Sequence, residues 1–98
     1  MMQTDQFKNR WMTLFASYGE TALIQDAFDD LTRRYAEKHR YYHTLRHIDI
    51  CLTLLDEVDG LVSDLFSVET AIWFHDVIYD PLRNDNEAMS AAYAKRFL

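Results

Sequence analysis

Apolar residues recur at intervals of three and four along nearly the whole chain, and this period constrains the fold more than any other feature. A helix places residues three and four apart on one face, whereas a half-buried strand needs strict alternation. The 98 residues include two glycines and one proline, which leaves little turn material to connect many strands. The pattern therefore predicts an all-α fold in a single domain over residues 1–98, and it disfavours β-sandwiches and barrels.

The same period gives bounds for about five helices. We expect the first from an N-cap at Thr4 to a C-cap at Gly19, the second from about Thr21, the third from about Thr44 to Glu57, the fourth from about Val68 to Asp76, and the fifth from near Asn84 to the last residue. The third is apolar around much of its circumference, which predicts a central position. A left-handed turn at Gly60 is expected to end it. The fifth has no cap at its end, so the chain looks cut short.

Charge and cysteine content limit the classes of partner. Ten basic residues against sixteen acidic ones give a net charge of −6, which disfavours nucleic acid as a partner and favours a small ligand, or a cation that bridges to an anionic one. No run of 18 apolar residues is present, so we expect no membrane span. The N-terminus lacks the shape of a signal peptide. Cys51 is the one cysteine, which suits a reducing compartment and predicts a cytoplasmic location.

The histidines supply the first candidate site. His43 and His47 are one helical turn apart, so both side chains can point the same way. His47 shares its stripe with Cys51, Leu54 and Val58, which we expect to face the core. His75 follows Val68, Ala71 and Ile72 at helical spacing and is expected to face inward too. The imidazoles of His47 and His75 are therefore predicted to converge.

Asp76 strengthens this prediction because it lies in an apolar run near the C-terminal end of a helix. A carboxylate there meets the negative end of the helix dipole and loses water, and both effects are unfavourable. A metal ion held by His47, His75 and Asp76 would remove the conflict, since imidazole and carboxylate suit Zn, Fe, Mn or Ni. The alternative is that His75 is a core histidine with satisfied hydrogen bonds, and that Asp76 caps the helix or pairs with an arginine: Arg33, Arg34 or Arg83.

Three segments together resemble the HD superfamily of metal-dependent phosphohydrolases: YHTLRHI (42–48), AIWFHDVIYDP (71–81) and DNEAMSA (85–91). More narrowly, they are similar to the bacterial branch of predicted HD phosphohydrolases. The resemblance covers roughly residues 35–98. It implies an HD-like helical bundle, of which this chain is the N-terminal half, with His75 and Asp76 as ligands of a divalent cation (Fe, Mn, Ni, Zn or Mg). HD enzymes complete the metal site with an Asp on a later helix, and no such residue is present here.

Two assignments of the remaining ligand stay open. The YHxxxH pattern is also similar to that of cyclic-nucleotide phosphodiesterases, in which the later histidine binds metal and the earlier one donates a proton to the leaving group. This similarity implies His47 as the metal ligand and His43 as the catalytic acid, and the reverse assignment is the alternative. Arg40 is a candidate to hold a phosphate through both guanidinium nitrogens, or else it is a solvated surface arginine.

The residues after Asp76 offer further candidates. Asp80 could orient the nucleophile, but an Asp directly before a proline is equally typical of a turn. Asn84 and Glu87 have the spacing of a helix N-capping box. The resemblance also makes Asn86 and Glu87 candidates to line the substrate site.

The sequence thus predicts a phosphohydrolase that uses a metal-activated water to cleave a small phosphorylated substrate, a phosphate ester or nucleotide. One alternative is a non-catalytic metal-binding or regulatory module. Another is a structural helical fragment that forms a homodimer through its exposed end and the aromatic stripe of its first helix.

Overall fold

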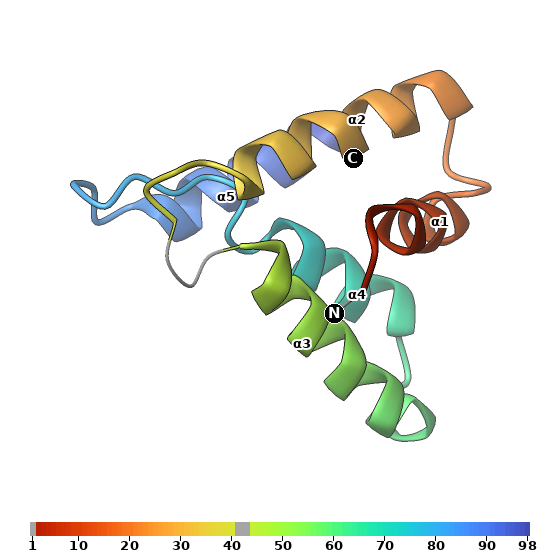
Figure 1. Cartoon of the computed structure of the whole chain (residues 1–98). Coiled ribbons are helices and arrows are strands. Elements are labelled where there is room, and N and C mark those ends of the chain that lie inside the picture. Colours follow the sequence, from red (N-terminus) through yellow and green to blue (C-terminus); the bar gives the residue numbers. More distant parts are fainter. Residues whose placement is uncertain (1, 41–43) are drawn as a thin grey trace.

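The structure is a computed structural model that describes residues 2–40 and 44–98, and all regular structure in these two ranges is helical. In chain order the elements are α1 (Thr4–Leu14), α2 (Thr21–Tyr35), α3 (Leu45–Val58), the short 3-10 helix η1 (Asp59–Leu61), α4 (Leu65–Phe74) and α5 (Asn86–Phe97) (Figure 1). The prediction of an all-α fold with five α-helices is confirmed.

The buried core is aromatic and centres on Trp11 of α1. Its ring lies edge-on to that of Trp73 in α4, with centroids 5.4 Å apart, and its indole N–H donates a 2.9 Å hydrogen bond to the carbonyl of Ile24 in α2. Phe97 of α5 lies against the same ring, with centroids 5.7 Å apart. Aromatic rings bury large apolar areas and prefer such tilted arrangements. One residue therefore joins α1, α2, α4 and α5 around a common core.

The helix ends differ from the predicted ones because tertiary contacts decide them. Gln3, not Thr4, is the N-cap of α1, and its backbone N–H donates to the side-chain oxygen of Gln6. The helix ends at Leu14 and gives way to tighter turns, well before Gly19. These turns place Phe15 in the core beside Trp11, with ring centroids 4.6 Å apart.

The segment between α3 and α4 also departs from the prediction. Gly60 lies inside η1 and makes no left-handed turn, since no described residue has a positive φ. Asp64 then caps α4 by accepting hydrogen bonds from the backbone N–H and the hydroxyl of Ser67. As a result α4 begins at Leu65 and ends at Phe74, so that His75 and Asp76 lie in the turn that follows the helix.

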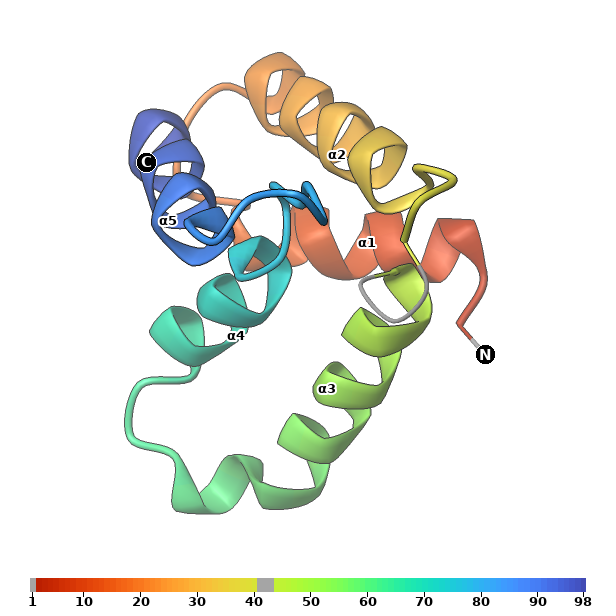
Figure 2. The ribbon, with the colours of Figure 1, turned by 90° about the vertical axis from the view of Figure 1, so that its left-hand side faces the viewer.

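The predicted central position of α3 is wrong. Ile48, Leu52 and Leu55 are buried, but Leu54 is 56% and Val58 44% exposed. In Figure 2, α3 and η1 extend away from α2 and α5, with α4 as the neighbour of α3. An apolar circumference is not enough to bury a helix that packs along one side only. Within the described ranges, no helix is long and apolar enough to cross a membrane.

Candidate metal centre

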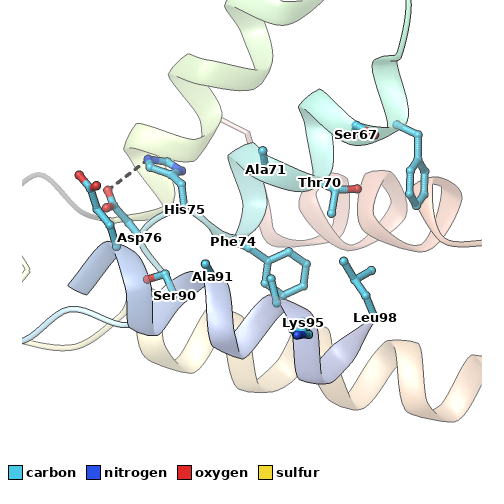
Figure 3. Close-up of a pocket in the computed structure, with 13 residues that line it drawn as sticks. Ser67, Thr70, Ala71, Phe74, His75, Asp76, Ser90, Ala91, Lys95 and Leu98 are labelled. Atoms are coloured by element: carbon cyan, nitrogen blue, oxygen red, sulfur yellow. Dashed lines mark ion pairs between the residues drawn. The ribbon is translucent and has the colours of Figure 1, made fainter. Parts of the chain in front are cut away.

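His47, His75 and Asp76 converge on one point, although they come from separate elements. His47 lies in the first turn of α3, and His75 and Asp76 follow the last turn of α4. One ligand atom from each lies within 4.8 Å of the others, and the two imidazole centroids are 5.3 Å apart. Figure 3 shows His75 beside Asp76, where Nε2 and Oδ2 are 3.2 Å apart.

This cluster lies at the surface and not in the core. The side chain of His75 is 38% exposed, and His47 is partly buried. The prediction that both histidines face inward is therefore wrong, because their stripes meet along the open junction of α3 and α4. A ligand that enters from solvent has access to all three side chains.

Hydrogen bonding fixes the ring of His75 in the orientation that a metal ligand needs. Its Nδ1 is 2.7 Å from the carbonyl oxygen of Ile72, which can only accept, so Nδ1 carries a hydrogen. A protonated ring would form an ion pair with the carboxylate of Asp76 through Nε2–H, which the dashed line in Figure 3 marks. In a neutral ring Nε2 presents its lone pair to that carboxylate, and a cation held by both groups would take the place of the proton. A backbone carbonyl that orients a ligating histidine is a common feature of metal sites, and the donor set suits a divalent cation.

The arginines considered as partners of Asp76 are paired elsewhere. Arg33 and Arg34 both bond the carboxylate of Asp30 on their own helix, and Arg83 pairs with Asp85. The alternative in which one of these three neutralises Asp76 is therefore wrong.

The backbone of Asp76 is held from two sides. The hydroxyl of Tyr35, at the end of α2, donates to the carbonyl of Trp73 at 2.9 Å and accepts from the N–H of Asp76 at 3.3 Å. Burial raises the pKa of this hydroxyl, so it stays a neutral donor. The Arg40 guanidinium donates to the carbonyls of Asp76 and Val77, both at 2.6 Å. Together these contacts fix the turn that carries His75 and Asp76.

Arg40 is an internal residue, so the alternative of a solvated surface arginine is wrong. Its side chain is fully buried, and the guanidinium stacks over the ring of Tyr35 and bonds Glu37. Its donors meet two backbone carbonyls and the carboxylate of Glu37, so the guanidinium holds the protein's own groups. No local pattern indicates this burial, because the two carbonyl partners of Arg40 lie 36 and 37 residues away.

Two residues of α5 hold the loop that leads away from the cluster. The side-chain amide of Asn86 both donates to the carbonyl and accepts from the N–H of Asp80. One turn on, the hydroxyl of Ser90 makes the same pair of bonds to Ile78. The carbonyl of Tyr79, between them, lies 2.7 Å from Nε2 of His39. Side chains thus supply hydrogen-bond partners for the backbone N–H and C=O groups of this loop, as a neighbouring strand would. Sequence reasoning missed these contacts.

The structure places the other predicted residues as follows. The carboxylate of Asp80 accepts from the N–H of Leu82, which confirms the turn interpretation, and Asp80 does not belong to the three-residue cluster. The prediction of a capping box formed by Asn84 and Glu87 is wrong, since Asp85 is the N-cap of α5.

The two residues predicted to line the substrate site have different surroundings. Asn86 binds the loop backbone, whereas Glu87 lines a groove next to His75 and Asp76. His43 lies outside the described residues.

That groove runs between α4 and α5 with a volume of about 780 Å³, and Figure 3 shows the residues along it. His75, Asp76 and Glu87 line one part of it, and small or apolar side chains line most of the rest, with Lys95 among them. Thr70 lines it too, and its buried hydroxyl has no hydrogen-bond partner among the residues that the structure describes. A groove of this size and character next to a cluster of donors suits a small organic ligand.

Cys51 lies beside the cluster, one turn after His47 on α3, although it is not one of the three residues whose ligand atoms all lie within 4.8 Å of one another. Its Sγ lies 3.7 Å from Nε2 of His47. The thiol lines a second groove, between α3 and α4, together with His75. Burial, and then the charge of Asp76, raise the pKa of Cys51. The four-residue interval between His47 and Cys51 is the sequence signal for this contact, and it also fits the predicted stripe facing the core.

Comparison of the chain with models of protein families, with curated proteins and with solved structures gives no match.

Proposed function

We propose that His47, His75 and Asp76 bind a divalent cation, and that the chain is a metal-dependent phosphohydrolase of the HD superfamily, acting on a small phosphate ester or nucleotide. The observation that carries this proposal is the convergence of two imidazoles and a carboxylate within 4.8 Å, with the ring of His75 oriented by the carbonyl of Ile72. Fe, Mn, Ni, Zn and Mg are the candidate cations. The reduced thiol of Cys51 supports a cytoplasmic location.

When bound, the cation would activate a water molecule and polarise a phosphoryl oxygen. Nε2 of His75 and a carboxylate oxygen of Asp76 would hold it, and His47 would supply the third donor. Tyr35 and Arg40 keep Asp76 in place through its backbone. The groove between α4 and α5 would receive the remainder of the substrate, with Glu87 in its wall. We assign proton donation to the leaving oxygen to His43.

The test is the metal content of the purified chain, measured by elemental analysis after dialysis without chelator. We expect near-stoichiometric metal in the unmodified protein, and its loss in both His47→Ala and His75→Ala. The control is His39→Gln, which removes a histidine outside the cluster but keeps a donor for the Tyr79 carbonyl. Loaded protein is then assayed with mono- and diesters of 4-nitrophenol and with nucleotides. Unchanged metal content in the alanine variants would contradict the proposed site.

A second candidate is a non-catalytic metal-binding or regulatory module that forms a homodimer. It is favoured by the accessible surface of 6568 Å², since a compact protein of 11.7 kDa exposes about 5,900 Å². The excess is close to the roughly 800 Å² that each partner buries in a standard interface. This candidate predicts metal uptake without hydrolysis and a mass near twice 11.7 kDa by light scattering. Turnover by a monomer would exclude it.

A further inference from the structure

We propose that Cys51 is a fourth protein donor to the cation, so that the centre is a two-histidine, one-cysteine, one-aspartate site that prefers Zn²⁺ or Co²⁺ to Mg²⁺. This inference rests on the proposed function, because it concerns the same cation. It goes beyond that function by naming the class of metal and a ligand that the resemblance to the HD superfamily does not imply.

The first argument is distance. Zn–N and Zn–S bonds of about 2.0–2.1 and 2.3 Å, at a tetrahedral angle, place the two donor atoms about 3.5 Å apart. The observed separation of Cys51 Sγ and His47 Nε2 is 3.7 Å, in a hydrogen bond that a cation bound by both atoms would replace. Residues one turn apart on a helix present their side chains to the same point. The α3 helix therefore already spaces this pair as two ligands of one cation.

The second argument is direction. Cys51 and His75 line the same groove between α3 and α4, so the thiol faces the side of the cluster that α4 supplies. Cys51 is partly buried and lies at the edge of the buried stripe of α3, which Ile48, Leu52 and Leu55 form. We expect the thiol to close on the cation by rotation about its Cα–Cβ bond.

The third argument is chemistry. On binding, the S–H bond breaks, its proton passes to solvent, and the thiolate sulfur bonds the cation with no change of oxidation state. Thiolate is a soft ligand that suits Zn²⁺ and Co²⁺, whereas Mg²⁺ prefers oxygen donors. Three ligands of the HD type would accept either class of metal, so Cys51 is the residue that makes the centre selective.

The test is a titration of the metal-free full chain with Co²⁺, followed by absorption spectroscopy. A cobalt–thiolate bond gives an intense near-ultraviolet charge-transfer band, which imidazole and carboxylate do not give. Because the chain has a single cysteine, that band can come only from Cys51. We expect the band in the unmodified protein, its absence in Cys51→Ser, and a loss of about tenfold or more in Zn²⁺ affinity with unchanged Mg²⁺ affinity.

A matched control moves the thiol by two residues. In the double variant Cys51→Ser, Thr53→Cys the cysteine lies on the exposed side of α3, away from the cluster, and we expect no charge-transfer band. A second measurement needs no variant: Zn²⁺ should slow alkylation of the native thiol by iodoacetamide at least tenfold, and Mg²⁺ should not. This readout decides the matter if the serine variant does not fold.

The outcomes separate the two proposals. Weak visible bands of bound Co²⁺ without the near-ultraviolet band would overturn the role of Cys51 and leave the three-ligand site standing. Absence of any Co²⁺ or Zn²⁺ binding to the unmodified chain would overturn both proposals together.

Discussion

At the scale of single residues, the candidate site depends on how the backbone of Asp76 is held. The sequence predicted which three side chains converge, because histidine and aspartate in an apolar setting are unusual enough to notice. It did not predict Tyr35 and Arg40 as their supports. Tyr35 has the spacing of an ordinary core residue, and its contact with Asp76 spans 41 positions. Contacts at such a separation leave no local pattern to recognise.

Removal of the Tyr35 hydroxyl should weaken both the fold and the site. In Tyr35→Phe the carbonyl of Trp73 and the N–H of Asp76 lose a partner, and we expect the free energy of unfolding to fall by about 1–2 kcal/mol. Metal affinity, measured by calorimetric titration, should fall severalfold because the turn is less fixed. Tyr18→Phe is the control, since that hydroxyl is at the surface. Equal metal affinity in the two variants would show that Tyr35 does not position Asp76.

Arg40 should not tolerate lysine. A lysine ammonium cannot reproduce the planar fork that bonds two successive carbonyls and stacks on Tyr35. We expect Arg40→Lys to lower the free energy of unfolding by about 2–3 kcal/mol in urea. The matched change Arg83→Lys, at the exposed pair with Asp85, should leave the free energy of unfolding nearly unchanged. An equal loss of unfolding free energy in the two variants would show that the buried contacts of Arg40 do not stabilise the fold more than the exposed pair does.

At the scale of helices, the period of apolar residues was sufficient to locate five of them, but their ends depended on contacts. The end of α1 is set by burial of Phe15, and the start of α5 by the loop that Asn86 and Ser90 hold. The apolar pattern overestimates the burial of α3, because it depends on the number of apolar residues and not on how many neighbouring helices cover them. Each error arises where a tertiary contact outweighs a local preference.

The junction of α2 and α5 should respond to acid. Burial opposes ionisation of Asp30, but hydrogen bonds from Tyr93, Arg33 and Arg34 outweigh it and lower the pKa of Asp30 to about 2. Because this value is below the ordinary 3.8, the carboxylate stabilises the fold above about pH 4, and the contribution is lost as the pH falls toward 2. We expect Asp30→Asn to cost roughly 1 kcal/mol at pH 7, since solvent screens this half-buried carboxylate.

Urea unfolding at pH 7 and near pH 2.5 provides the measurement. The difference between Asp30→Asn and the unmodified protein should shrink at the lower pH, where the native carboxylate begins to gain its proton. Asp29→Asn, on the same helix but outside this cluster, is the control. A cost for Asp30→Asn that stays constant over this range would contradict the low pKa.

At the scale of the whole molecule, the aromatic core and the arm formed by α3 and η1 (residues 45–61) differ in how firmly they are packed. Trp11, Trp73 and Phe28 are buried with their rings in contact, whereas Leu61 at the far end of the arm is 87% exposed. Regions with few buried apolar contacts open at low free energy. The arm is nonetheless the element that brings His47 and Cys51 to the cluster.

Hydrogen exchange should reveal this division. We expect amides of residues 54–64 to exchange much faster than those of α1 and α4, which lie at the core. Addition of Zn²⁺ should slow exchange in the first turns of α3, because a cation shared by His47 and His75 ties the arm to α4. Mg²⁺ is the comparison, and equal protection by the two ions would contradict the proposed selectivity. Mass spectrometry of peptic fragments resolves these segments.

The position of the cluster between two elements has a thermodynamic consequence. A cation bound across this junction stabilises the folded chain by an amount that rises with the logarithm of its free concentration, about 2.7 kcal/mol at one hundred times the dissociation constant. For a domain of this size a change of that order moves the melting temperature by roughly ten degrees or more. The lifetime of the folded protein in a cell would then follow the supply of the metal.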